Sequence, residues 1–297
     1  MGRTIIMKKL LAEVNISEGR DQEIVEAVKE ALLLEEGVDL IDLNADADHN
    51  RTVFTYTGSP AAVLEGTKRL VQKAIERIDM TKHHGSHPRM GAVDVVPFVP
   101  VSDVSIEEAI GIAREFGAFL GALGVPVFYY EECATRPERK NLVAIRKGEY
   151  EALPEKMQQE EWKPDEGPHA FVPKSGATVT GVRFPLVAFN VNLASTDMSV
   201  GKQIVKAVRG VTGGYKNIRA IALPVGDAGQ VQISMNVVNY RETPIHRVFE
   251  TIKSEAASHG IAVAECELVG PVPLAALEDV LKHYLRVHKF SMEQIYL

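Results

Sequence analysis

The same order of strands and helices occurs twice in this chain, and that repeat limits its fold more than any other feature. Short runs of apolar and β-branched residues predict strands, and apolar residues at helical spacing predict helices. The first strand-helix-strand-strand-helix-strand unit covers residues 10–14, 21–33, 38–43, 52–56, 59–75 and 93–99. The second covers residues 186–193, 200–209, 218–223, 231–238, 245–258 and 261–268.

Two βαββαβ units predict an α/β (α+β) protein with two lobes, each a sheet with helices packed on it. A helix at 106–123, a strand at 127–130 and helical segments at 139–159 extend the first lobe, and a final helix at 271–287 should pack on the second. Residues 162–183 have neither period, so we interpret them as an irregular functional or linking segment. We therefore expect domains at residues 1–180 and 181–297, with a ligand cleft between them.

Composition and charge exclude several classes of protein. The 297 residues carry a net charge of -7, which provides no basic field for nucleic acid or an anionic membrane. Only two cysteines occur, Cys133 and Cys266, without a metal-binding or disulfide pattern. The N-terminus does not resemble a signal peptide, and no run of about 18 apolar residues predicts a membrane span. These features predict a protein of the reducing cytoplasm.

A loop at residues 82–91 contains three histidines and an arginine, and Gly85 and Pro88 prevent it from being a regular helix. Three interpretations are open: a solvated turn, a zinc site, or a histidine that acts as general acid and base. The zinc site is disfavoured because the helical His-Glu-x-x-His pattern is absent. A histidine is suited to proton transfer because its charge changes near neutral pH.

Other motifs favour structural roles. Asp46, Asp48 and Asn50 have the spacing that opens an EF-hand, but the glycine and the final glutamate of that motif are missing, so a hairpin turn is the simpler interpretation. The glycines at 210–214 follow a predicted helix and are interpreted as its end. Four histidines lie on predicted helices or at their ends without partners in sequence, and we interpret them as structural: His246, His259, His283 and His288.

Five separated motifs together resemble the glutamate formimidoyltransferase family. They are Asn-Ile-Ser-Glu-Gly-Arg at 15–20, Asn-Arg-Thr-Val at 50–53 with Thr-Gly at 57–58, the segment 78–94 with His-Pro-Arg-Met-Gly, Gly-Glu-Tyr-Glu-Ala-Leu-Pro at 148–154, and residues 167–181. The resemblance covers almost the whole chain in the same order. It implies two formiminotransferase subdomains, N-terminal (1–180) and C-terminal (181–297).

The resemblance also implies an activity. The family transfers the formimino group of N-formimino-L-glutamate to N5 of tetrahydrofolate, its co-substrate, in histidine degradation and one-carbon metabolism. His87 matches the family's catalytic acid and base, and no metal is required. The folate-binding segment of the family matches Gly167, Pro168, His169, Ala170, Phe171, Val172, Pro173, Lys174, Ser175 and Gly176. A homodimer is expected.

Both substrates are anionic, so basic side chains near the site are candidates to bind their carboxylates. These are Arg51, Arg89, Lys174 and Arg183, for each of which a surface role is the alternative. Asn44 stands where mammalian relatives have aspartate, and Val14 and Ile16 stand where relatives often have proline and phenylalanine. Mammalian relatives continue into a cyclodeaminase domain. Since this chain stops at Leu297, we expect a separate enzyme to cyclise the product.

Two alternatives to this activity stay open. The first is transfer of a formyl group between 5-formyltetrahydrofolate and glutamate, because a formyl and a formimino group differ by one atom. The second is a non-catalytic folate-binding protein, for which His87 would be dispensable. The sequence does not distinguish the preferred length of the folate polyglutamate tail.

Overall fold

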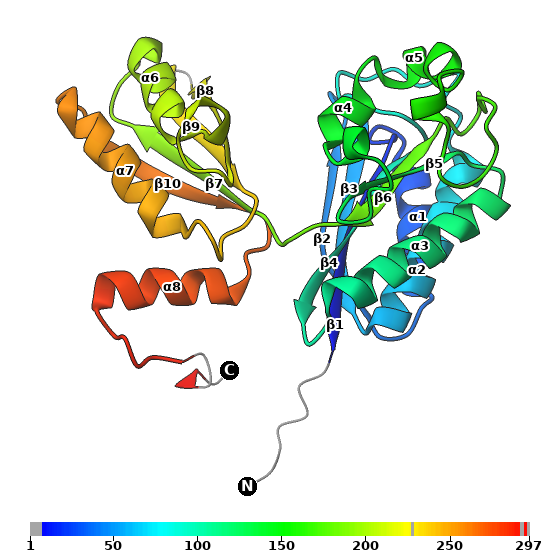
Figure 1. The fold of residues 1–297 in the computed structure, drawn as a ribbon, viewed down its shortest axis with the longest axis horizontal. Coiled ribbons are helices and arrows are strands. Elements are labelled where there is room, and N and C mark those ends of the chain that lie inside the picture. The colour runs from blue at the N-terminus through cyan, green and yellow to red at the C-terminus, as the bar shows by residue number, and fades with distance from the viewer. Residues whose placement is uncertain (1–7, 227–228, 292–293, 296–297) are drawn as a thin grey trace, which may run out of the picture. The chain divides into compact units, whose positions relative to one another are not determined.

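The computed structural model describes residues 8–226, 229–291 and 294–295. The chain divides into two compact units, with the boundary between Arg183 and Phe184. Each unit contains one of the two βαββαβ repeats, so the predicted fold class is confirmed (Figure 1). The ligand cleft expected between the lobes stays a prediction.

Unit 1 is built on a six-stranded mixed sheet. Its repeat consists of β1 (Lys9–Ile16), α1 (Gln22–Leu33), β2 (Val38–Asp46), β3 (Arg51–Gly58), α2 (Pro60–Arg77) and β4 (Val93–Ser102). The chain continues through α3 (Ile106–Ala122), β5 (Val127–Glu131), α4 (Leu142–Arg146), α5 (Glu149–Lys156) and β6 (Thr178–Val182). The strands lie in the order β2-β3-β1-β4-β6-β5, and β2 and β3 form the predicted antiparallel hairpin.

The two faces of this sheet have different surroundings. Along β1, residues with even numbers are buried and those with odd numbers are partly exposed, as a strand covered on one face requires. The buried face packs against α1, α2 and α3, which lie together on one side of the sheet (Figure 1). Around β4, β5 and β6 the other face packs against α4 and α5, and this smaller core includes Phe128, Ile145 and Leu153. Polar side chains of β1 and β3 are therefore left partly exposed.

The prediction of an irregular segment at 162–183 is wrong in part, because β6 lies within it. This strand is inserted between β4 and β5 and pairs with both in parallel. All five of its residues are buried, so they show no alternation of polar and apolar residues. Three of its five residues are threonine or glycine, so the sequence contains no hydrophobic run that would predict a strand there.

Unit 2 repeats the same arrangement in a four-stranded antiparallel sheet. Its elements are β7 (Val187–Leu193), α6 (Met198–Val208), β8 (Ile218–Val225), β9 (Gln230–Val237), α7 (Ile245–Ser258), β10 (Val263–Val269) and α8 (Leu274–Leu285). The strand order is β10-β7-β9-β8. The predicted final helix is confirmed as α8, whose Ala276 is 2% exposed in the core of this unit. In the described part of the chain, no helix has the length and apolarity to cross a bilayer.

Candidate functional site

The histidine loop is fixed to the turn between β2 and β3. A Cβ atom on Gly85 would lie 2.3 Å from the carbonyl oxygen of His49, so only glycine fits this close approach. Asn50, which is 7% exposed, donates from Nδ2 to the carbonyl oxygen of His84 at 2.9 Å and accepts from the Gly19 amide at 3.0 Å. The motifs around residues 19, 50 and 84 therefore meet at the end of the sheet where β1 stops and β2 turns into β3.

Arg89 fixes the other end of the loop to α5. Its guanidinium Nη1 donates to carboxylate oxygens of Glu149 and Glu151, both at 2.9 Å, and its carbonyl oxygen accepts from the Tyr150 amide at 2.8 Å. The residue as a whole is 8% exposed. The charge predicted to bind a substrate carboxylate is thus already paired with carboxylates of this chain.

The segment predicted to bind folate lies directly beside the histidine loop. Gly91 and Gly176 form an antiparallel β-bridge, and the Ala92 amide donates to the carbonyl oxygen of Ser175 at 2.8 Å. A Cβ atom on Gly91 would lie 2.4 Å from that same oxygen, so the two backbones approach too closely for any side chain. The fold therefore brings together two segments that are about 80 residues apart in sequence.

The first half of the predicted folate segment is more open. His169, Ala170 and Pro173 are exposed, whereas Phe171 is partly buried and packs edge-on against Tyr150 with 5.4 Å between ring centroids. The Tyr150 hydroxyl also donates to the carbonyl oxygen of Pro173 at 2.7 Å. Tyr150 thus fixes the middle of the segment, whereas His169, Ala170, Pro173 and Lys174 are exposed.

His87 is partly buried, and its ring lies edge-on to that of His49 with 6.2 Å between centroids. Burial, followed by the positive charges of Arg51 and Arg146 and by His49, lowers the pKa of His87 to about 4. The imidazole is consequently neutral at pH 7. A neutral imidazole accepts a proton, which is the first task of a general base.

The two arginines near His87 come from different elements. Arg146 ends α4 and forms an ion pair with Asp94, a β4 residue that is 2% exposed and also accepts from the Met90 amide at 2.9 Å. Arg51 begins β3. Among the described residues, the Nε atoms of Arg51 and Arg146 are buried without a hydrogen-bond partner.

The sequence named Arg51 as a candidate cation, whereas neither Arg146 nor Asp94 was a candidate. Asp94 stood inside a recognised motif without an assigned function, and Arg146 lies in a short helix that carries no motif. The other candidate cations are engaged elsewhere: Arg183 forms an ion pair with Glu13, and Lys174 donates to the carbonyl oxygen of Glu76 at 3.2 Å. No cluster of three or more His, Cys, Asp or Glu side chains suited to a metal occurs in the described part of the chain.

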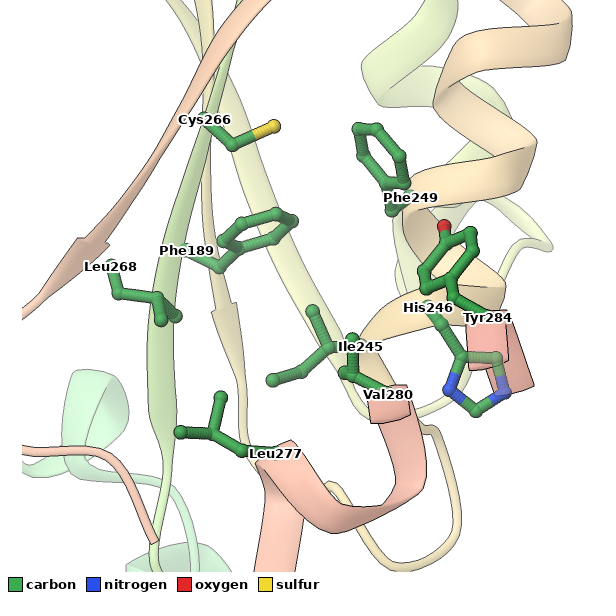
Figure 2. Close-up of a pocket in the computed structure, with 9 residues that line it drawn as sticks. All are labelled: Phe189, Ile245, His246, Phe249, Cys266, Leu268, Leu277, Val280 and Tyr284. Atoms are coloured by element: carbon green, nitrogen blue, oxygen red, sulfur yellow. The ribbon is translucent and has the colours of Figure 1, made fainter. Parts of the chain in front are cut away.

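A cavity of about 230 Å³ in unit 2 is a weaker candidate (Figure 2). It lies between the sheet and helices α7 and α8, and its lining includes Phe189, Phe249 and Leu277. His246 contributes a buried Nδ1 without a partner among the described residues and stacks on His283 at 4.3 Å. None of the described residues that line the cavity is a carboxylate, lysine or arginine, so an anionic ligand has no charged partner there.

Comparisons with known proteins show which family the chain is similar to. Residues 9–183 match the N-terminal subdomain of the formiminotransferase domain, and residues 188–295 match the formiminotransferase domain. The chain is 45% identical to glutamate formimidoyltransferase of Streptococcus pyogenes serotype M1 over 93% of both chains. It is 43% identical to glutamate formimidoyltransferase of Thermoplasma acidophilum, covering 93% of this chain and 92% of that protein.

A longer relative is formimidoyltransferase-cyclodeaminase of Mus musculus, which is 44% identical over 94% of this chain and 53% of its own length. Both units are covered by these matches, and the motifs that converge on His87 lie within them. The chain therefore belongs to the glutamate formimidoyltransferase family.

Proposed function

We propose that this protein is a transferase that moves the formimino group from N-formimino-L-glutamate to N5 of tetrahydrofolate, giving 5-formiminotetrahydrofolate and L-glutamate. The family supports the reaction, since relatives that match over more than nine-tenths of their length are named glutamate formimidoyltransferase. The observation that carries the assignment to unit 1 is the contact between the histidine loop and the segment from Gly167 to Gly176.

His87 is proposed to carry a proton from N5 of tetrahydrofolate to the glutamate nitrogen that leaves. Attack of N5 on the formimino carbon forms the new C–N bond, and N5 must lose its proton. The glutamate nitrogen must gain a proton as the old C–N bond breaks. A neutral imidazole can take the first proton and deliver the second, so no net proton is consumed. The low pKa of His87 supports this order, with the imidazole as base first.

The segment from Gly167 to Gly176 is proposed to cover the pterin of tetrahydrofolate. Its exposed positions are open to a ligand, and its C-terminal half is held in unit 1 by Tyr150 and by the bridge between Gly91 and Gly176. Holding both substrates together supplies much of the rate in a reaction of this type. We further propose a cytoplasmic homodimer that acts in histidine degradation.

The test is replacement of His87 by alanine, with His84→Ala as the matched control. His84 lies in the same loop, but its side chain is exposed. His87→Ala should lower turnover by about 10²- to 10⁴-fold with little change in tetrahydrofolate affinity, whereas the control should keep its turnover. Unchanged turnover of His87→Ala would remove the residue from the mechanism.

The same assay distinguishes the donors if the folate product is identified by mass. The proposal is supported if the rate of 5-formiminotetrahydrofolate formation from formiminoglutamate is much higher than the rate of formyl product formation from formylglutamate. Activity with the formyl donor alone would assign the formyl reaction instead. Binding of tetrahydrofolate without any transfer would leave a folate-binding protein.

A further inference from the structure

Resting on the proposed function, we infer that Arg51 and Arg146 together bind the α-carboxylate of the formimino donor beside His87, with Asp94 holding Arg146 in position. Arg146 is paired with Asp94, and the nearby Asp46 is bonded to His49 at 2.7 Å. No carboxylate of the described residues forms an ion pair with Arg51. Asp46 and Asp94 are near enough to raise the pKa of Arg51, but neither lies at ion-pair distance from it among the described residues.

The hydrogen-bonding capacity of the two guanidinium groups leads to the same conclusion. Both Nε atoms are buried and have no acceptor within the described chain. Burial lowers the pKa of Arg51, the Asp46 carboxylate raises it and Arg146 lowers it again, so the two cations are close enough to repel each other. Two partly buried cations that repel each other are stabilised by an anion placed between them.

The covalent structure of the substrates indicates which anion it is. In the donor, the α-carboxylate is attached to the carbon next to the nitrogen that leaves. It must lie close to whichever group protonates that nitrogen. The carboxylates of the folate tail are separated from N5 by the whole aminobenzoyl group. A cationic pair beside His87 is therefore suited to the donor and not to the folate tail.

The position of Arg146 follows from the local fold. Asp94 accepts from the Met90 amide, which lies three residues after His87, and its other oxygen accepts from Arg146. One buried carboxylate thus connects the histidine loop with the end of α4. Arg146 is a binding residue, and Asp94 is a positioning residue that acts through it.

The experiment compares two donors with matched variants. N-formimino-γ-aminobutyrate lacks only the α-carboxylate, and N-formimino-2-aminobutyrate lacks only the γ-carboxylate. Arg146→Gln and Arg51→Gln should each lower kcat/KM about 10- to 100-fold for the α-carboxylate donors, with KM for tetrahydrofolate unchanged. Neither variant should change kcat/KM for N-formimino-γ-aminobutyrate by more than about twofold. Lys147→Gln removes an exposed charge at the next position and serves as the control.

An equal loss with both kinds of donor would overturn the inference, because the arginines would then act on the reaction and not on the α-carboxylate. Arg146→Gln breaks the ion pair with Asp94 and could therefore misfold. Arg51→Gln leaves that ion pair intact and tests the same subsite independently. Calorimetry with L-glutamate and γ-aminobutyrate, in the absence of folate, tests binding without turnover. Glutamate binding that both variants weaken supports the subsite even if formimino transfer fails. Unaltered glutamate binding by both variants refutes it.

Discussion

The neutral state of His87 gives a prediction that does not depend on the substrate. An exposed histidine has a pKa near 6.5, whereas that of His87 is lowered to about 4 by burial and by Arg51, Arg146 and His49. Folding therefore favours the neutral ring, and the unfolded chain binds the proton more tightly. Since the unfolded state takes up this proton as the pH falls below 6.5, the free energy of unfolding must decrease between pH 6.5 and 4. Above pH 6.5 the contribution is fully present.

The size of the effect follows from the two pKa values. At pH 5 an unfolded histidine is almost fully protonated and folded His87 is mostly neutral, so stability is lower by about 2 kcal/mol than at pH 7.5. Because the ring is only partly buried, solvent screening reduces this to about 1 to 2 kcal/mol. The glutamine in His87→Gln cannot titrate. Between pH 7.5 and pH 5, the free energy of unfolding of this variant should therefore fall by about 1 to 2 kcal/mol less than that of the native protein.

The assay is urea unfolding of the native protein and of His87→Gln at pH 7.5 and pH 5. His83 and His246 also have lowered pKa values, but they are present in both proteins and cancel in the comparison. An NMR titration of the histidine ring carbons, in which the His87 signal is identified by its absence from the variant, measures the pKa directly. Equal pH dependence of the two proteins, or a pKa near 6.5, would refute the electrostatic description of the site.

Three further predictions concern the segments around the loop. Replacing Arg89 with methionine should lower stability by about 2 to 4 kcal/mol, because it removes a buried cation bonded to two glutamates. Glu151→Gln, at the exposed partner, should cost less than about 1 kcal/mol. Similar losses of stability for the two variants in thermal unfolding would contradict this. Gly91→Ala should cost about 1 to 3 kcal/mol because its Cβ meets backbone at 2.4 Å, while Gly111→Ala, in open space within α3, should stabilise by about 0.5 to 1 kcal/mol. Urea midpoints that move in the same direction would count against the packing argument. Lys156→Met should cost about 1 to 3 kcal/mol because the ammonium donates to three carbonyl oxygens at the end of α4. An unchanged urea midpoint would contradict this and would mean that water takes the place of the ammonium as donor.

Much of the fold was predictable because each repeat has strong local signals. Asp21 and Ser59 cap the first two helices with their side chains, as expected from residues that precede periodic apolar runs. The missed strand β6 had no such signal, since a fully buried strand does not alternate. Its place in the sheet is decided by pairing with β4 and β5, which are distant in sequence.

The site was predictable only in part, and for a similar reason. Gly85 and Pro88 identified a loop, and the resemblance drew attention to His87 and to residues 167–176. The contact between Gly91 and Gly176 required the folded sheet. Arg89 was selected as a candidate for its charge, but a sequence does not show that a charge is already paired. Arg146 carried no signal, since its importance comes from Asp94 across the fold.

The last strand of each repeat has different neighbours in the two sheets. In unit 1, β4 is covered by β6, whereas the corresponding strand β10 in unit 2 is an edge strand. An open edge offers unpaired backbone groups to strands of other molecules and so promotes aggregation. Glu265 and Glu267 lie on β10 and accept hydrogen bonds from Asn192 and Asn190 of the neighbouring strand. Unit 1 thus protects the end of its repeat with added strands, and unit 2 protects the same position with negative charge.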